Sequence, residues 1–207
     1  MTLDQYRDLA DRLLAPFVAA ADRLGLTPDG VSVVAFAFAV AAGGAFALST
    51  PLWYALGALF VLCNGWLDLV DGALARAQGV ESDGGDLLDH VLDRYADIVM
   101  LVGLAAGIDA YALGLAAVTG VLMTSYLGTQ IQAVGLGRAY GGLVGRADRL
   151  AIIGVVAFAA ALSLSVATVP VRPFGLTLVG WLLVFFAVVG HLTALQRFWG
   201  AWSDLSS

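Results

Sequence analysis

The chain has 207 residues, of which 60% are hydrophobic and 13% charged, and its mean hydropathy is +0.89. Such a composition leaves too little polar surface for a soluble domain, so it predicts a membrane protein with several spans. The net charge of −6 and the pI near 4.6 argue against nucleic acid as a partner, because binding to a phosphate backbone needs a basic surface.

An amphipathic helix is predicted at the start of the chain, over residues 3–24. Its apolar side chains, from Leu3 to Leu24, fall on one arc of about 100° when successive residues turn by about 100°. The pattern favours a helix in the membrane interface, covering residues 1–26, although a helix packed on the surface of a bundle needs the same pattern. Pro16 predicts a kink or a division into two helices.

Six apolar segments follow, and each approaches the roughly 20 residues that cross a bilayer. Thr-Pro pairs at 27–28 and 50–51 are typical of helix starts and precede the first two segments. We therefore predict an all-α integral membrane protein, a single domain over residues 1–207 in which a six-helix bundle occupies 27–207. The predicted spans are Val31–Ser49, Leu52–Leu67, Leu87–Ile108, Ala110–Val134, Leu150–Val169 and Phe174–Gln196.

The arginines set the predicted orientation of these spans. All ten basic residues are arginine, and six spans place both termini on the same side of the membrane. That side also carries the loops near 76–86 and 135–149. It holds nine of the ten arginines if Arg94 lies at that end of its helix, and Arg172 alone lies opposite. By the positive-inside rule, the termini and these loops face the cytoplasm of a multi-pass cell-membrane protein.

Charge is concentrated between residues 65 and 97 of this apolar chain. Asp68 and Asp71 are three residues apart, and Asp89 and Asp93 are four apart, so each pair shares one helix face. The two acidic faces meet if the chain turns between the helices. The residues that allow such a turn are Gly79, Gly84 and Gly85.

Four carboxylates in one cleft repel one another, and poor solvation adds to the cost. Two divalent cations would remove this cost, and all-oxygen ligands suit Mg²⁺ or Mn²⁺ better than Zn²⁺. Paired ions of this kind are typical of sites that act on phosphate. Arg76 adds a guanidinium suited to a diphosphate, while Gly72 and Ala75 leave room for a flat ligand on the same helix face. The alternative is that the acids only solvate a loop, which does not require two facing pairs.

This stretch resembles the signature of the CDP-alcohol phosphatidyltransferase family. The signature reads D-x2-D-G-x2-A-R, then a short spacer, then G-x3-D-x3-D, and the chain matches it with a spacer of eight residues. The matching residues are Asp68, Asp71, Gly72, Ala75, Arg76, Gly85, Asp89 and Asp93. The six spans, the interfacial helix and the Thr-Pro start of the first span extend the resemblance over nearly the whole chain.

The resemblance implies a homodimeric membrane enzyme that transfers a phosphatidyl group from a CDP-linked lipid to a polar alcohol and releases CMP. It implies that Asp68, Asp71 and Asp89 bind the metal ions, and that Asp93 is a metal ligand, the general base or both. It assigns the CDP pocket to Asp68, Gly72, Ala75, Arg76 and Gly85. The donor would be CDP-diacylglycerol or CDP-archaeol. An acidic chain without lysine is typical of a high-salt cytoplasm and favours a halophilic archaeon, although GC-rich coding has the same effect.

The sequence defines the acceptor alcohol less well. Residues 124–150 resemble the inositol-phosphate-accepting branch, which has basic residues soon after a Ser-Tyr pair and an Arg-x-x-Arg-Leu start to span five. The chain keeps the second feature but has Gly128 and Gln130 in place of the first. Three arginines could clamp an acceptor phosphate, or could anchor helix ends without any ligand. They are Arg146, Arg149 and Arg197. Inositol phosphate, glycerol phosphate and serine stay open as acceptors.

Two other functions fit parts of the pattern. An intramembrane prenyltransferase with N-x3-D-x3-D motifs would explain Asn64 and Asp68, but the next acid is Asp71 rather than residue 72, and six spans are too few. A small cation carrier would explain buried acids, but not the fixed spacing of Gly72 and Arg76.

Overall fold

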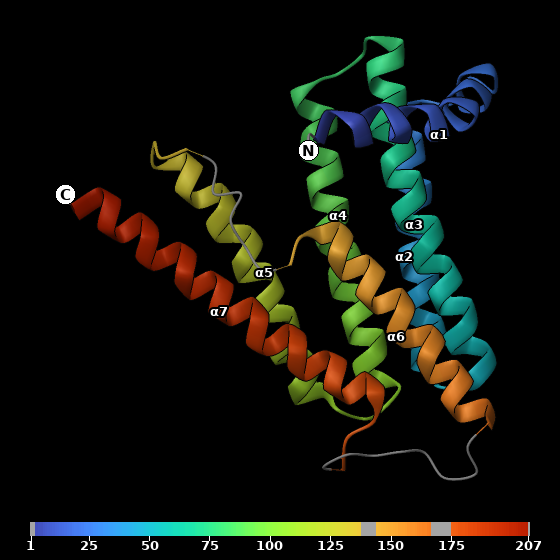
Figure 1. Ribbon diagram of the computed structural model, residues 1–207, viewed down its shortest axis with the longest axis vertical. Helices are drawn as coiled ribbons and strands as arrows, with labels where there is room; N and C mark the ends of the chain where they lie inside the picture. The colour runs from blue at the N-terminus through green and yellow to red at the C-terminus, as the bar shows by residue number, and fades with distance from the viewer. Residues whose placement is uncertain (1–2, 138–143, 167–174, 207) are drawn as a thin grey trace.

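The computed structural model describes residues 3–137, 144–166 and 175–206, without the side chains of residues 3–11 and 166. Within these ranges every regular element is an α-helix (Figure 1). The helices are α1 (Leu3–Arg23), α2 (Pro28–Ala47), α3 (Pro51–Gln78), α4 (Asp83–Ala106), α5 (Tyr111–Ala133), α6 (Arg146–Val166) and α7 (Leu178–Ser206).

Five helices in the described part of the chain are long and apolar enough to cross a membrane, namely α2, α3, α5, α6 and α7. The chain is therefore a multi-pass membrane protein, and five of the expected spans coincide with helices of this kind. Helix α4 has 24 residues, but its first four turns carry the acidic stripe. The predicted end of the fifth span, the start of the sixth and Arg172 fall in residues 167–174, outside the described residues.

The Thr-Pro pairs start α2 and α3 as predicted. The Thr27 hydroxyl accepts a hydrogen bond from the Gly30 amide at 3.2 Å, which caps α2. Thr50 occupies the same position before α3, but its side chain makes no capping hydrogen bond. Proline is the first residue of both helices, where its missing N–H costs no helical hydrogen bond.

Helix α3 continues well past the predicted end of the second span at Leu67 and reaches Gln78. Gly79 ends it in the left-handed conformation, with φ of 65°, and its amide donates to the last turn. Of the three glycines expected to form the turn, only this one does so. Gly84 and Gly85 instead lie in the first turn of α4, where the Gly85 amide donates to the Ser82 hydroxyl at 3.1 Å. The acids of α3 therefore stand on an unbroken helix.

Helix α1 packs on α3 through one face of its second half. Its Leu14 and Ala21 are buried against Val70 and Leu74. Helix α1 is continuous through Pro16, so the predicted division into two helices is wrong. The apolar residues that were expected to line the same face up to and including Ala10 lie outside the described side chains.

Glycines allow two pairs of helices to approach closely. The backbones of α2 and α4 meet at Gly43 and Gly103, where a Cβ on Gly103 would overlap the Gly43 carbonyl group. The backbones of α5 and α7 meet in the same way at Gly120 and Gly190. Helix α6 packs on α3 and also contacts α7.

Figure 1 shows how this packing places the charged segments at one end of the molecule. Helix α1 lies across the ends of α3 and α4, and both termini lie towards this end. The α3–α4 connection, the last turn of α5 and the start of α6 are on the same side. The acidic faces of α3 and α4 and the arginines of α6 are thus brought together.

Candidate active site

Three carboxylates from two helices converge beneath α1. Oxygen atoms of Asp68 and Asp71 on α3 and of Asp89 on α4 all lie within 4.8 Å of one another. Asp71 is buried, and the other two are half-buried. The hydroxyl of Ser32 on α2 donates to Asp71 Oδ2 at 2.6 Å, which fixes the orientation of that carboxylate. We call these three residues the acidic triad.

The surroundings of the triad fit a hard cation. Asn64, one turn before Asp68, is 2% exposed. Its Nδ2 donates to the Ala35 carbonyl at 2.9 Å, while its Oδ1 accepts no hydrogen bond from the described residues. A small cavity of about 10 Å³ borders Asn64 and all three acids. A buried oxygen among carboxylates requires a cation or a water, and oxygen ligands of this kind suit Mg²⁺ or Mn²⁺.

Asp93 follows Asp89 by one turn, but its carboxylate faces arginines. Its Oδ1 lies 2.6 Å from Nη2 of Arg146, and its Oδ2 lies 3.6 Å from Nη2 of Arg94. The other terminal nitrogen of Arg146, Nη1, lies 2.5 Å from Asp68 Oδ1. A single guanidinium therefore bridges α3 and α4. Of the four predicted metal ligands, three form the triad and Asp93 stands beside it.

A cavity of about 510 Å³ opens on one side of the triad, between α2, α3 and the start of α4. It contains most of the residues expected to form a CDP pocket, namely Gly72, Ala75, Arg76 and Gly85. The fifth, Asp68, lines the small cavity at the triad instead. Thr27, Asp29 and Ser32 complete the wall from α2, and sequence reasoning did not single them out. The only sequence feature that could have identified Ser32 as a site residue was its hydroxyl group, one turn after Pro28 in an apolar span. We call this space the donor cavity.

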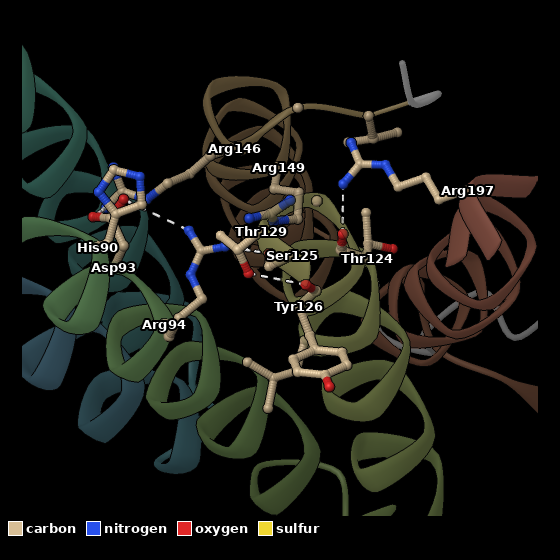
Figure 2. A pocket seen from close by; sticks show the side chains of 14 residues that line it. His90, Asp93, Arg94, Thr124, Ser125, Tyr126, Thr129, Arg146, Arg149 and Arg197 are labelled. Atoms are coloured by element: carbon tan, nitrogen blue, oxygen red, sulfur yellow. Dashed lines mark hydrogen bonds and ion pairs between the residues drawn. The ribbon is translucent and has the colours of Figure 1, made fainter. Parts of the chain in front are cut away.

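A second cavity, of about 660 Å³, lies on the other side of Asp93 (Figure 2). Four arginines from three helices line it, and they include all three arginines expected to contact the acceptor. These four are Arg94, Arg146, Arg149 and Arg197. Hydroxyl groups of Thr124, Ser125 and Thr129 on α5 face them. We call this space the arginine cavity.

Each arginine of this cavity is held by a specific partner. Arg149 donates to Asp97 Oδ2 at 2.7 Å, and both side chains are buried. Arg94 donates to the Ser125 hydroxyl, and Arg197 donates to the Thr124 carbonyl. Among the described residues, the buried Nε atoms of three of these arginines have no hydrogen-bond acceptor. These are Arg94, Arg146 and Arg149.

Arg94 was not predicted as a site residue. In the sequence it served only to predict the orientation of the spans. Its position directly after Asp93 was visible, but adjacent helix residues point about 100° apart. Its role in the cavity depends on how α5 packs against α4, which the sequence pattern does not define.

The missing basic residue on α5 also has a structural explanation. A Cβ on Gly128 would lie 2.9 Å from Arg197 Nη1. The glycine therefore makes room for a guanidinium that arrives from α7, in the place where the sequence comparison led us to expect a basic side chain of α5.

Comparison with known families identifies this architecture. Residues 25–193 match the family model described as CDP-alcohol phosphatidyltransferase, which covers both cavities and the acidic triad. The chain belongs to the CDP-alcohol phosphatidyltransferase family. It is therefore an enzyme of phospholipid synthesis that transfers a phosphatidyl-type group from a CDP-linked lipid to an alcohol. The resemblance inferred from the spaced aspartates is confirmed, and membership disfavours the carrier and prenyltransferase interpretations.

Two relatives are named as synthases of inositol phosphate lipids. The chain is 29% identical over 204 residues to archaetidylinositol phosphate synthase of Methanothermobacter thermautotrophicus, covering 98% of this chain and 95% of the relative. It is 35% identical over 195 residues to phosphatidylinositol phosphate synthase of Mycolicibacterium smegmatis, with coverages of 90% and 82%.

Solved structures of the phosphatidylinositol phosphate synthase of Mycobacterium tuberculosis have the same fold. One, with CDP-DAG bound, superposes with a TM-score of 0.76 at 28% identity, covering 92% of this chain and 94% of that one. Another, in complex with manganese and citrate, has a TM-score of 0.76 at 27% identity, with coverages of 91% and 88%.

Proposed function

We propose that this enzyme transfers a phosphatidyl or archaetidyl group from CDP-diacylglycerol or CDP-archaeol to a hydroxyl group of inositol phosphate, with release of CMP. The observation that carries the proposal is the arginine cavity beside Asp93, directly next to the acidic triad. An acceptor held there presents its hydroxyl to Asp93 and to the donor phosphate at the same time.

The donor cavity suits the CDP part of the lipid. Gly72 and Ala75 leave the α3 surface open: a Cβ on Gly72 would meet only Arg76, at 3.6 Å. Arg76 supplies a guanidinium for the diphosphate. The CDP-DAG bound to the mycobacterial relative supports a donor of this class. The archaeal relative and the acidic, lysine-free composition favour CDP-archaeol as the lipid.

The acidic triad is proposed to hold two divalent ions, Mg²⁺ or Mn²⁺, with Asp93 as a further ligand, as the general base or as both. When bound, such ions supply positive charge to the diphosphate and to the departing CMP. The protein's own contribution is orientation. Ser32 holds Asp71, and Asn64 offers a buried carbonyl oxygen beside the same carboxylates.

Asp93 is proposed to remove the proton of the acceptor hydroxyl. The hydroxyl oxygen then forms a bond to the lipid-linked phosphorus, and the bond from this phosphorus to the oxygen of CMP breaks. Asp93 is suited to this role because its carboxylate borders both the triad and the arginine cavity.

The four arginines favour an acceptor that carries a phosphate. Bidentate arginine contacts match the geometry of a phosphate dianion, whereas serine has no phosphate to occupy them. Glycerol 3-phosphate meets the same electrostatic requirement and is the second candidate. The names of the relatives favour inositol phosphate over it.

We also propose a membrane placement. Helix α4 would be the third of six spans in chain order, in addition to the five apolar helices, because 24 residues extend about 36 Å. Both termini and both cavities would face the cytoplasm, and α1 would lie in the interface with exposed Leu13 and Phe17 towards lipid. The family resemblance implies a homodimer, which cross-linking in native membranes would test.

An acceptor panel tests the proposed function. Purified enzyme with CDP-archaeol or CDP-diacylglycerol and Mg²⁺ or Mn²⁺ is offered inositol 1-phosphate, glycerol 3-phosphate, serine or free inositol, and CMP and lipid product are measured. We expect inositol 1-phosphate to give the highest kcat/KM. Preference for glycerol 3-phosphate would reassign the acceptor, and no CMP with any acceptor would refute the proposal.

A further inference from the structure

Arg146 occupies a position that no other arginine of the site shares. It is the first residue of α6, and its two terminal nitrogens lie 2.5 Å from Asp68 Oδ1 and 2.6 Å from Asp93 Oδ1. These contacts are short and charge-assisted, and the Arg146 side chain is 17% exposed. One cation therefore holds a carboxylate of the triad and the carboxylate proposed as the base.

The same guanidinium also forms part of the wall of the arginine cavity. Arg146 lines both that cavity and the small cavity at the triad, as Asp93 does. Arg149, three residues later, lines the arginine cavity and not the cavity at the triad. It pairs with Asp97, which is neither a member of the triad nor the proposed base. The two arginines thus face the same space but hold different acids.

The contacts of Arg146 compete with catalysis. While Asp93 Oδ1 lies 2.6 Å from the Arg146 guanidinium, that oxygen is not available to the hydroxyl group of an acceptor. A metal ion and a guanidinium also compete for the carboxylate of Asp68, since both are cations. A phosphate in the arginine cavity offers Arg146 an alternative anion of higher charge, with the geometry for a bidentate contact.

We infer that Arg146 couples the acceptor phosphate to the catalytic carboxylates. Without acceptor it holds Asp68 and Asp93, and the acceptor phosphate draws its guanidinium into the arginine cavity. Asp68 is then available to a metal ion and Asp93 to the acceptor hydroxyl. Arg146 is in this sense a positioning residue, and the inference rests on the function proposed above.

The coupling has a chemical purpose. Water in place of the alcohol would break the same phosphorus–oxygen bond of the CDP-lipid and give CMP and a lipid phosphate. If Asp93 is freed only when acceptor phosphate is present, this loss of activated lipid is suppressed. The device links recognition of the acceptor to assembly of the site.

Metal binding tests the inference without any CDP-lipid. Mn²⁺ affinity is measured by calorimetry on the full-length enzyme, with and without inositol 1-phosphate, and corrected for Mn²⁺ bound by the free phosphate. We expect inositol 1-phosphate to tighten Mn²⁺ binding by at least about tenfold and, by thermodynamic reciprocity, Mn²⁺ to tighten inositol 1-phosphate binding equally.

Two variants separate this coupling from a general effect of phosphate on the site. Arg146→Gln should bind Mn²⁺ at least about tenfold more tightly than the parent without acceptor, and should lose the coupling. Arg146→Lys keeps the charge, but one ammonium cannot reproduce the two-pronged bridge, so its Mn²⁺ affinity should be intermediate. Arg149→Gln is the matched control: it should weaken acceptor binding and leave acceptor-free Mn²⁺ affinity unchanged.

Lipid hydrolysis provides the second measurement. In Arg146→Gln, CMP release measured in the absence of acceptor should rise above the parent rate, whereas Arg149→Gln should show no such rise. Unchanged or weaker Mn²⁺ binding in both Arg146 variants would overturn the inference, even if inositol 1-phosphate is the acceptor. Absence of transfer to any acceptor would instead refute the proposed function and leave the metal measurement standing.

Discussion

Asp93 and Asp97 show how neighbouring aspartates acquire different tasks. They are one helical turn apart on α4, and both are buried. Asp93 faces Arg146 and borders the acidic triad, whereas Asp97 lies 2.7 Å from Arg149, which lines the arginine cavity. In the proposed function, the first acts on the acceptor hydroxyl, and the second orients an arginine that binds the acceptor.

This difference predicts distinct kinetic defects. Asp93→Asn should lower kcat by at least about 100-fold, because loss of a general base typically costs that much. The enzyme should stay folded, since Arg146 keeps Asp68 and Arg94 keeps Ser125 as partners. Steady-state CMP release and thermal unfolding in detergent provide the measurements.

Asp97→Asn is the control for this change. It should raise the KM of the acceptor more than it lowers kcat, because Arg149 loses its charged partner but the base is intact. Full activity of Asp93→Asn would remove this residue from the role of base.

At this scale the sequence predicted the residues that spacing alone brings together. Asp68 and Asp71 share a helix face at any angle of packing, and Asp89 needed only a turn after α3 to reach them. Ser32 and Arg94 were not predicted as site residues. Their contacts depend on the distances between α2, α3, α4 and α5, which a single sequence does not define.

Among the elements, the pairing of α2 with α4 is decisive for the site. Helix α2 carries Ser32 and α4 carries Asp89, so their separation sets the geometry of the triad. The two backbones touch at Gly43 and Gly103, well below the charged end. Small residues at such a crossing replace side-chain packing with direct backbone contact.

Gly103→Ala should therefore destabilise the enzyme and weaken its metal site. The added Cβ overlaps the Gly43 carbonyl and forces the helices apart, at a cost of about 1–3 kcal/mol. Gly44→Ala is the matched control, because a Cβ there has no neighbour within 4 Å. Thermal unfolding with and without Mn²⁺ measures both effects. Equal stability of the two variants would contradict the close-contact interpretation.

In this chain, hydropathy predicts which segments lie in the membrane but not where the helices end. Apolar segments gave five of the predicted spans, because burial in lipid requires them. They did not predict the end of α3. This helix continues through polar residues to Gln78 and ends there because Gly79 adopts the left-handed conformation. Helix α4 shows the same conflict, since its acidic stripe lowers the hydropathy of a long helix.

In the whole molecule, the donor cavity and the arginine cavity lie on either side of the acidic triad and Asp93. Helices α2, α3, α4 and α6 all contribute to this centre, so the triad is a junction of the bundle. A cation bound there neutralises repulsion between two helices. Metal binding should therefore stabilise the entire fold.

Removal of divalent ions tests this junction. Saturating Mn²⁺ at about 100 times its dissociation constant should add about 2.7 kcal/mol to the free energy of unfolding. EDTA should reverse this gain and abolish CMP release. In Asp71→Asn the melting temperature should respond much less to Mn²⁺, because one ligand of the triad has lost its charge. A melting temperature that ignores Mn²⁺ in the parent enzyme would argue against a metal at the triad.

The contact between Gly128 and Arg197 has a consequence for the evolution of the enzyme. A Cβ at position 128 would lie 2.9 Å from the guanidinium that α7 extends towards Thr124, so a side chain there requires the end of Arg197 to move. A lineage that gains a lysine on α5 must therefore first shorten or redirect residue 197, and one that loses such a lysine opens a place for Arg197. We therefore predict that positions 128 and 197 are coupled, so that the cavity can keep its charge while the helix that supplies the charge changes.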